Sequence, residues 1–396
     1  MAVSTNPASQ SSRSRRVEFI DLLRGWAVIV MIETHVSNAT LTEPITSSWL
    51  FQYIKFLNGL VAPSFLFASG LAYAITTRRK LNDYLSFGPL LTKQFGRLFF
   101  VLIIGYVLHL PKFNFNQLLH ETTSQEWLVF YQADVLHCIA VSLLFMQAVL
   151  LVLKSERRLY LTLTVIAVGV LFVTPLMWGP DVGAVFPAPI AAYVNGLDHS
   201  LFPIFPWSAF LFAGAIVGYY YLHAKESVGP GAGNEERFMK SLSWFALSII
   251  IVAPIIEPFA ARTYPTYDYW RFSPSFVLLR LGIVLLLCVG MFFYEKRRGV
   301  SPRSVVTLIG RESLIVYVVH LLLIYGDFGT FNFTEYVNKS FGYVEAVVTT
   351  LVLFGLMYAL ALVWSRIKRG SPRLKRVLNF ATLAIVLGVF FFGPGE

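Results

Sequence analysis

The stretch EFIDLLRGWAVIVMIETHVSNAT, residues 18–40, holds the features that decide the fold of this chain. Its middle part, from Phe19 to Val36, has the length and apolar content of a helix that crosses a membrane. The same stretch carries four ionisable side chains in its interior, Asp21, Arg24, Glu33 and His35. An ionisable side chain inside a bilayer costs at least about 2.5–3.5 kcal/mol on insertion scales. Four of them in one helix therefore need a functional or a packing reason.

The composition of the whole chain is that of a membrane protein. Hydrophobic residues make up 56% of the 396 residues and charged residues 14%, whereas soluble domains contain about 25% charged residues. Apolar runs long enough to cross a bilayer recur with no long polar stretch between them. We therefore expect one integral, multi-pass membrane domain over residues 18–396. Residues 1–17 are polar, rich in serine and basic, and are expected to form a disordered arm.

The apolar runs predict an all-α fold, a bundle of about eleven transmembrane helices. The helices are expected near residues 19–36, 57–77, 91–110, 133–153, 159–178, 201–222, 241–257, 275–294, 306–326, 342–365 and 377–393. Small-xxx-small patterns at Gly70–Ala74 and Gly214–Gly218 mark places on the second and sixth helices where another helix can approach closely.

Basic residues alternate sharply between the connections of these helices. One set of connections, which includes the N-terminal arm, holds 24 of the 32 Lys and Arg residues, and the other set holds five. Cytoplasmic connections of membrane proteins are enriched in Lys and Arg. The pattern therefore predicts a cytoplasmic N-terminus and a C-terminus on the outer side. The net charge of +10 is concentrated in these connections, where basic residues set the topology of a membrane protein. The charge therefore does not indicate a nucleic-acid partner, and we expect the chain to lie in a lipid bilayer.

Three of the ionisable residues in the first helix share one face. At about 100° per residue, Asp21, Arg24 and His35 fall in one sector, and Glu33 points elsewhere. Arg24 and His35 are eleven residues apart, or about 16.5 Å of helical rise. This face therefore runs from a cation near the cytoplasmic surface to an imidazole near the outer surface. The alternative is an Asp21–Arg24 ion pair at the helix end together with a histidine that only packs.

Polar residues elsewhere in the apolar runs separate by side. The predicted outer ends hold most of the histidines and two aspartates, namely His109, Asp134, His137, Asp198, His199 and His320. The predicted inner ends hold Arg97, Arg311 and Glu312. Histidine suits proton transfer near neutral pH, and arginine suits phosphate groups because its planar fork donates two hydrogen bonds. The distribution favours a phosphorylated donor on the inner side and a reacting centre toward the outer side.

The histidines do not have the spacing of a metal site. No H-x₃-H or H-E-x-x-H pair occurs, and the histidines are spread over several helices. We therefore predict no metal.

Five segments of the chain resemble, in this order, motifs of bacterial transmembrane acyltransferases related to heparan-α-glucosaminide N-acetyltransferase. They are IDLLRGWAVIVMIETH (20–35), APSFLFASGLAYAI (62–75), ADVLHCIAVSLL (133–144), FPIFPWSAFLFAGAIVG (202–218) and GRESLIVYVVH (310–320). Five ordered motifs are far more specific than any one of them. The opening motif, with LRG followed by a histidine, is also similar to the wider membrane O-acyltransferases that modify surface sugars.

The resemblance implies a bundle of about eleven helices in a bacterial inner membrane. It also implies an acetyl-CoA or other acyl-CoA that enters from the cytoplasm and a sugar or glycan acceptor on the other side. Arg24 and Arg311 lie in the matching motifs and are candidates to contact the CoA phosphates. Asp21 and Arg97 complete the set of candidate cofactor-binding residues.

Acyl transfer from a thioester needs a base that activates the acceptor and a place for the developing oxyanion. His35, in the first motif, is our predicted general base. His320 and His137, the latter with Asp134 as its orienting partner, are the alternatives. The first outer loop, residues 37–59, contains no histidine, whereas the lysosomal branch of the family is thought to use one there. Direct transfer and a covalent acyl-histidine intermediate both stay open.

Two other functions fit the residues. Intramembrane His and Asp also occur in the proton relays of transporters, and helices broken at Pro63, Pro203 and Pro206 would suit a substrate pathway. In a structural subunit, the polar groups would only bridge helices. An acyltransferase releases a free thiol from acyl-CoA, which a proton-coupled transporter does not. The acyl group, the acceptor and the oligomeric state, a homo-oligomer included, are left open.

Overall fold

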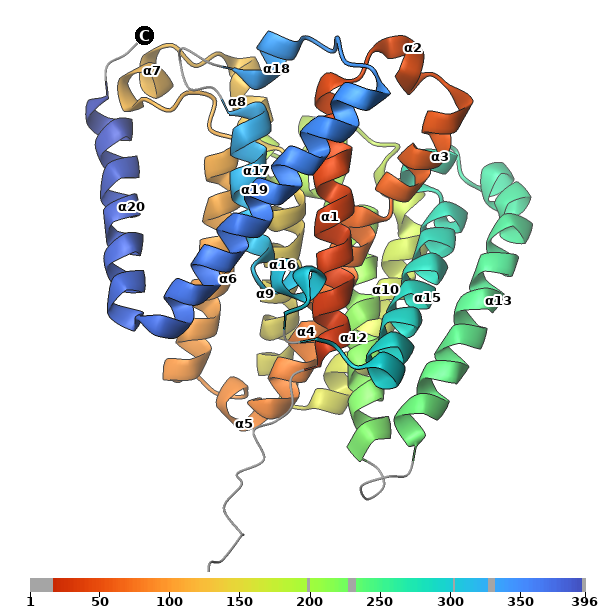
Figure 1. The fold of residues 1–396 in the computed structure, drawn as a ribbon. Helices are drawn as coiled ribbons and strands as arrows, with labels where there is room; N and C mark the ends of the chain where they lie inside the picture. The colour runs from red at the N-terminus through yellow and green to blue at the C-terminus, as the bar shows by residue number, and fades with distance from the viewer. Residues whose placement is uncertain (1–16, 198–199, 227–232, 302, 327–331, 394–396) are drawn as a thin grey trace, which may run out of the picture.

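The computed structural model describes residues 17–197, 200–226, 233–301, 303–326 and 332–393 (Figure 1). Within these ranges the chain is almost entirely helical, and an isolated β-bridge joins Leu41 and Phe341. A helix satisfies its own backbone hydrogen bonds, which a bilayer interior requires because it offers no water. The predicted all-α class is confirmed. Of the predicted arm, residues 1–17, only Val17 lies in the described ranges.

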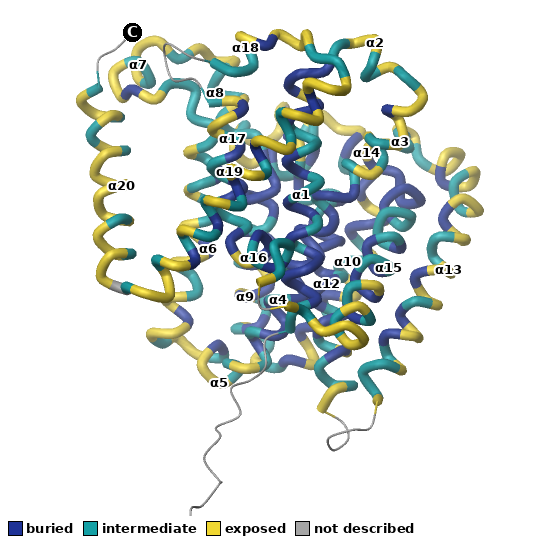
Figure 2. The backbone as a smooth tube through the Cα atoms, in the orientation of Figure 1, coloured by how far each residue is buried: buried dark blue, intermediate teal, exposed yellow. Residues whose placement is uncertain are grey.

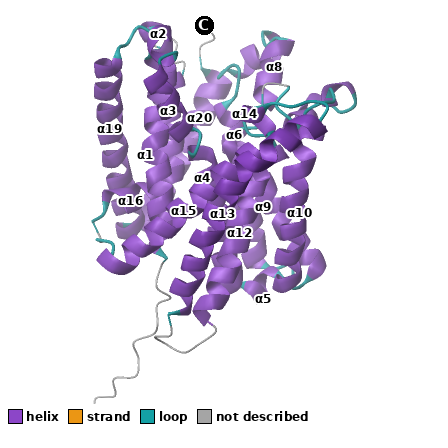
Figure 3. Cartoon of the chain, turned by 90° about the vertical axis from the view of Figure 1, so that its right-hand side faces the viewer, coloured by secondary structure: helices purple, strands orange, loops and turns teal. Residues whose placement is uncertain are grey.

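Long helices run between two ends of the bundle, as Figures 1 and 3 show. They are α1 (Glu18–Thr40), α4 (Val61–Arg79), α6 (Pro89–Leu108), α9 (Val135–Leu153), α10 (Glu156–Met177), α12 (Ile204–Glu226), α13 (Asn234–Thr263), α15 (Pro274–Arg298), α19 (Tyr343–Gly370) and α20 (Pro372–Phe392). A pair of shorter helices, α16 (Val305–Arg311) and α17 (Ser313–Tyr325), occupies one further position. We call the end where α1 begins the lower end and the opposite end the upper end, as they stand in Figure 1.

Short helices cover the connections, mostly at the upper end (Figure 1). They are α2 (Glu43–Thr46), α3 (Trp49–Asn58), α5 (Leu81–Tyr84), α7 (Phe115–His120), α8 (Ser124–Tyr131), η1 (Val182–Ala184), α11 (Ala188–Val194), α14 (Tyr269–Phe272) and α18 (Phe333–Val337). Of these, α5 lies at the lower end. The hydropathy pattern did not distinguish these short helices from loops, because none of them is long enough to show a periodicity of its own.

Ten of the eleven predicted transmembrane segments each coincide with one described helix, and the remaining segment, 306–326, is divided between α16 and α17. Nine helices of the described chain are long and apolar enough to cross a membrane, or ten if the bent pair α16–α17 counts as one span. The chain is therefore a multi-pass integral membrane protein. α1 is not among the nine, because its ionisable residues exceed the polarity of an ordinary span. The count of eleven crossings and the orientation of the termini stay predictions.

The segment 306–326 is not the single continuous helix that its hydropathy predicts. The axes of α16 and α17 meet at 86°, and the break lies at Glu312, which has non-helical dihedral angles. The buried carboxylate of Glu312 forms a salt bridge of 2.5 Å with Lys368 of α19. Hydropathy does not report a break of this kind, because both halves are apolar and the bend is held by contacts with other helices.

α4 and α12 pack closely through the small residues that the sequence marks. A Cβ atom added to Gly70 would overlap the carbonyl group of Leu211, and one added to Gly214 would overlap that of Phe67. A Cβ at Gly218 would come within 2.8 Å of Ala74. The predicted close approach is confirmed, and each of these two helices supplies the groove for the other.

α1 lies in the middle of the bundle. It packs against α4, α15, α16, α17 and α19, and Figure 2 shows most of its length buried while α20, at the periphery, is exposed along its length. Of the four ionisable residues of α1, Asp21 is buried and Arg24, Glu33 and His35 are partly buried, as intramembrane charges generally are.

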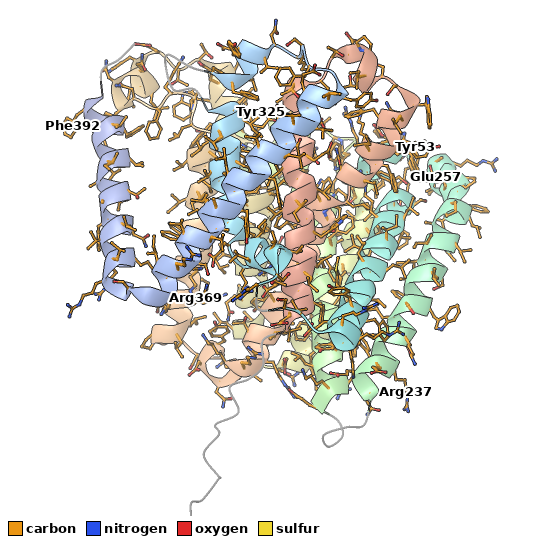
Figure 4. The ribbon with its side chains drawn as sticks, in the orientation of Figure 1. Tyr53, Arg237, Glu257, Tyr325, Arg369 and Phe392 are labelled. Atoms are coloured by element: carbon orange, nitrogen blue, oxygen red, sulfur yellow. The ribbon has the colours of Figure 1, made fainter. Side chains whose placement is uncertain are left out.

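The two predicted sets of connections lie at opposite ends of the bundle. Figure 4 labels Arg237 and Arg369, from the basic set, toward the lower end, and Tyr53 and Tyr325 toward the upper end. The polar residues predicted at the two sides are therefore separated along the axis of the bundle, and the candidate site can be divided into an upper and a lower part.

Candidate functional site

The upper part of the site begins where α1 and α17 meet. The ring centroids of His35 and His320 are 5.2 Å apart. Nδ1 of His35 lies 3.3 Å from the hydroxyl oxygen of Tyr325, and that hydroxyl donates to the backbone carbonyl of His35 at 3.2 Å. The last turn of α17 therefore holds the histidine of α1 beside its own histidine. These two candidates, 285 positions apart in the chain, form one pair.

Asp134 connects this pair to α9. Its carboxylate is buried and accepts hydrogen bonds from the hydroxyl of Tyr317, at 2.8 Å and 3.0 Å. Tyr317 lies three residues before His320, with 5.8 Å between the ring centroids. A buried carboxylate without partners would be costly, so Tyr317 both satisfies Asp134 and fixes α17 against α9.

The spacing of Asp134 and His137 suggests that the carboxylate orients the imidazole, but the two residues contact each other in a different way. Asp134 is the N-cap of α9, and its backbone N–H donates to Nδ1 of His137 at 3.2 Å. The carboxylate of Asp134 in turn accepts from backbone N–H groups of the first turn, including that of Val135. The two side chains thus form a reciprocal capping box. The imidazole is oriented by the Asp134 backbone, and the carboxylate is directed at Tyr317.

A second aromatic cluster surrounds His137. Its ring lies 4.3 Å from that of Tyr106, 6.0 Å from His109 and 6.1 Å from Tyr193, measured between centroids. The hydroxyl groups of Tyr106 and Tyr193 are 2.9 Å apart. A Cβ at Gly105 would come within 2.7 Å of the His137 ring, so α6 needs a glycine there to pass over the imidazole.

A cavity of about 290 Å³ opens next to this cluster. It is lined by Ile103, Tyr106, Val107, Leu110, Phe130, Tyr131 and Pro189. Its lining is apolar apart from the two tyrosine hydroxyls, and Tyr106 forms part of both the cavity wall and the His137 cluster. The exposed side chains of Ile103 and Val107 in its wall show that it opens on the outer surface of the bundle.

The hydrogen bonds indicate which ring nitrogen of each histidine carries the proton. Nδ1 of His320 lies 2.8 Å from the carbonyl oxygen of Val316, which can only accept, so Nδ1 is the protonated nitrogen. Nε2 of the neutral ring then has a free lone pair. In His137 the situation is reversed, because Nδ1 accepts from a backbone N–H and Nε2 must carry the proton. In the described part of the chain both Nε2 atoms are buried without a hydrogen-bond partner.

The lower part of the site lies where α16 crosses α1. A Cβ at Gly25 would overlap the carbonyl of Val306, and one at Gly310 would overlap the carbonyl of Asp21. These two glycines allow the helices to touch, and they bring Asp21 and the neighbouring Arg24 close to Arg311. Asp21 is buried, Arg24 is partly buried and Arg311 is exposed.

Arg311 is oriented by its own helix. Its Nε donates to the carbonyl of Thr307 at 3.1 Å, and Nη2 donates to the Thr307 hydroxyl at 3.2 Å. In the described ranges Nη1 of Arg311 forms no hydrogen bond. Arg97, by contrast, is an exposed residue of α6, which packs mainly on α9. The structure therefore groups Asp21, Arg24 and Arg311, and it places Arg97 on another helix.

A second basic region at the lower end follows α4. A surface cavity of about 470 Å³ is lined by residues 78–83, which include Arg78, Arg79 and Lys80. Arg78 is held by salt bridges to Glu156 at 2.6 Å and Glu226 at 2.5 Å. In the sequence these basic residues counted only toward topology, so this cavity was not predicted.

Sequence reasoning missed four residues near the site. Tyr106, Tyr193 and Tyr325 gave no signal, because tyrosine is common in membrane helices and at their ends. Arg280 did give a signal in the sequence, since it interrupts the apolar run FVLLRLGIVLLLCVG of α15. The predicted outer-side residues Asp198 and His199 lie outside the described ranges.

In the ranges that the structure describes, no group of three or more His, Cys, Asp or Glu side chains is placed to hold a metal ion. Four of the seven histidines instead lie in two pairs, His35 with His320 and His109 with His137. The lining of the upper part is thus made of imidazole, phenol and a single carboxylate.

The family model described as heparan-alpha-glucosaminide N-acetyltransferase, catalytic, matches residues 16–252, more than half of the chain. The matched region includes Arg24, His35, Asp134 and His137, and it ends before Arg311 and His320. A comparison with curated proteins finds no match.

Proposed function

Because the chain belongs to the heparan-alpha-glucosaminide N-acetyltransferase catalytic family, a family of membrane acetyltransferases, we propose that it moves an acetyl or other acyl group across the bilayer. The donor is an acyl-CoA at the lower, cytoplasmic end. The acceptor is the amine or hydroxyl group of a sugar that enters from the upper end. In a bacterial inner membrane these two sides are the cytoplasm and the periplasm.

The observation that carries this proposal is the continuous set of contacts in the upper part of the site. It runs from His35 to His320, through Tyr317 to Asp134, and on to His137. Three helices distant in the sequence place these groups together in the bundle interior. Buried polar groups are expensive, so a cluster of this kind inside a membrane domain indicates chemistry rather than packing alone.

The two tautomers suit the two tasks of acyl transfer. The lone pair on Nε2 of His320 takes the proton from the acceptor amine or hydroxyl as that group attacks the thioester carbonyl. The N–H on Nε2 of His137 is a donor of the type that stabilises the oxyanion of the tetrahedral intermediate. As the intermediate collapses, the carbon–sulfur bond breaks and the thiolate receives a proton, so the products are the acylated sugar and free CoA. We therefore assign the base to His320 and give His35, our sequence-based choice, the task of positioning it.

The lower part of the site supplies cations for the phosphates of CoA. Guanidinium groups bind phosphate through two parallel hydrogen bonds, and the α1–α16 crossing carries Arg24 and Arg311 near the lower end. The rise of about 16.5 Å along α1 from Arg24 to His35 is a distance that the pantetheine arm of CoA can span. Acyl-CoA supplies the activated thioester. The residues of the chain bind acyl-CoA and direct its thioester toward the upper part of the site.

We expect Arg311→Ala to weaken binding of acyl-CoA at least about tenfold, because charge-assisted hydrogen bonds contribute about 1.5–3 kcal/mol. Arg311→Lys should restore only part of the affinity, since lysine lacks the planar fork. Isothermal titration of the purified protein with CoA measures the effect. Arg303→Ala, an exposed arginine before α16, is the matched control and should bind as the wild type does. Equal affinities for the Arg311→Ala variant and the control would remove Arg311 from the donor site.

The proposed function is tested in proteoliposomes with acetyl-CoA on one side only. With acetyl-CoA at the lower face and glucosamine at the upper face, we expect free thiol and acetylated sugar to appear in equal amounts. The reverse arrangement should give neither product. Movement of sugar or protons without release of thiol would instead identify a transporter and would refute the acyltransferase.

A further inference from the structure

Arg280 is a charged residue inside the bundle that the proposed reaction does not use. It lies six residues after Pro274, the first residue of α15, or about 9 Å below the upper end of that helix. In the described ranges no hydrogen bond or ion pair of Arg280 occurs, and its Nε is buried without a partner. The rest of the side chain is partly accessible.

Two aromatic rings flank the guanidinium group. Its central carbon lies 3.9 Å from the ring centroid of Phe276 and 5.8 Å from that of Trp207. Cation–π contacts of this kind contribute about 0.5–2 kcal/mol each. An arginine within a span costs at least about 2.5–3.5 kcal/mol, and the rings cannot supply hydrogen-bond acceptors for its five donors. The rings therefore hold the plane of the guanidinium in place and leave its donors for another group.

The backbone of a neighbouring helix leaves room for this side chain. A Cβ at Gly59, between α3 and α4, would come within 2.9 Å of Nη2 of Arg280. Any larger residue at position 59 would push the guanidinium away. The fork of Arg280 is thus positioned by α15, α12 and the start of α4 together.

Arg280 is connected to the proposed reaction centre by a short series of contacts. The Trp207 ring beside it lies 4.8 Å from the ring of Phe202. The backbone N–H of Phe202 donates to the carbonyl of Ala133 at 2.8 Å. Ala133 directly precedes Asp134. The guanidinium therefore lies on the upper side of the bundle, across Trp207 and Phe202 from the carboxylate of the site.

We propose that Arg280 binds an oxyanion of the acyl acceptor, a carboxylate, phosphate or sulfate, so that the preferred acceptors are anionic sugars. This inference rests on the proposed function for the identity of the ligand. A planar oxyanion or a phosphate matches the guanidinium fork and supplies the missing acceptors. Held there, the anionic group anchors one end of the sugar while its amine or hydroxyl is directed to the histidines.

The binding experiment uses the whole chain in phosphatidylcholine nanodiscs, with glucosamine 6-phosphate as the anionic probe and glucosamine as the neutral probe. For the wild type we expect a saturable rise in unfolding temperature with the anionic probe that is at least twice the rise with the neutral one. Arg280→Met should abolish this difference, and Arg280→Lys should reduce it. Arg271→Met, which removes an exposed arginine of the adjacent α14 that pairs with Asp268, is the control and should keep it.

The unliganded variants separate binding from a structural role. Because Arg280 forms no hydrogen bond or ion pair in the described ranges, Arg280→Met leaves no unpaired charge behind and should unfold at the wild-type temperature or above. A clear fall in the unfolding temperature of the unliganded Arg280→Met variant would overturn the proposal, since it would show that Arg280 supports the fold.

Acyl transfer gives the second readout. The ratio of kcat/KM for glucosamine 6-phosphate to that for glucosamine should fall at least about tenfold in Arg280→Met, a loss in the range of one charge-assisted hydrogen bond. An unchanged ratio would overturn the inference while the acyltransferase stands. Anion-dependent stabilisation without any acyl transfer would keep the site and refute the proposed function. If stabilisation requires phosphatidylglycerol in the disc and no sugar phosphate reproduces it, the anion is a lipid headgroup and the proposal fails.

Discussion

Replacing His320 by glutamine is expected to lower the turnover number for acyl transfer at least about 10²-fold, the smaller end of what a general base contributes. Glutamine keeps most of the side-chain volume and can still donate to the Val316 carbonyl that His320 faces at 2.8 Å. The glutamine amide has no lone pair as basic as the one on Nε2 of His320. The attacking amine or hydroxyl of the sugar would therefore have no base to take its proton. The measurement is single-turnover release of thiol in proteoliposomes, together with CoA affinity and the unfolding temperature, both of which should stay near the wild-type values.

His223→Gln is the matched control for this experiment. His223 also has a buried Nε2 without a partner in the described ranges, and its ring lies 4.3 Å from that of Tyr219. It lies in the last turn of α12, at the lower end, away from the proposed centre. We expect this variant to turn over normally. Normal turnover in His320→Gln with an inactive His35→Gln would move the base to α1, where the sequence pattern first placed it.

The second large effect is expected on folding. Gly214→Val should destabilise the protein by more than about 3 kcal/mol, the upper end of ordinary overpacking costs, and should prevent recovery of a monodisperse protein. The reason is that a Cβ at this position overlaps the Phe67 backbone carbonyl, which cannot move away without separating α4 from α12. The yield after detergent extraction and the unfolding temperature report the change.

Gly290→Val in α15 is the control for the glycine substitution. A Cβ at Gly290 meets no atom within 4 Å, so the same change should alter the unfolding temperature by little and should not reduce the yield. The comparison holds the chemical change constant and varies only the neighbouring helix. If both variants extract and unfold alike, the α4–α12 contact is not what makes glycine necessary.

Much of the fold follows from the sequence because a bilayer restricts the backbone so strongly. Each apolar run long enough to span must be helical, and ten of the eleven predicted segments each coincide with one long helix; the exception is 306–326, which is divided between α16 and α17. The capping box of α9 is also local, since Asp134 and His137 lie three positions apart. The small residues at Gly70 and Gly214 predicted close packing correctly, because only glycine lets two helix backbones touch.

Parts of the site were also accessible from the sequence. An ionisable residue in an apolar run is improbable enough to mark function by itself, and this argument selected His35, Asp134, His137 and His320. The structure brings all four into one set of contacts. The same argument applied to Arg280 would have found the additional cation.

What the sequence by itself determined is the set of apolar segments that form the long helices, the asymmetry of charge between their connections and the list of polar residues that lie inside them. The tertiary structure alone decided the break at Glu312, the pairing of Asp134 with Tyr317, and the pairing of His35 with His320. Spans and caps depend on neighbours a few positions away in the chain, which the sequence displays. The partner of a buried carboxylate and the bend of an apolar helix depend on residues from other helices, whose approach is set by packing that no local pattern contains.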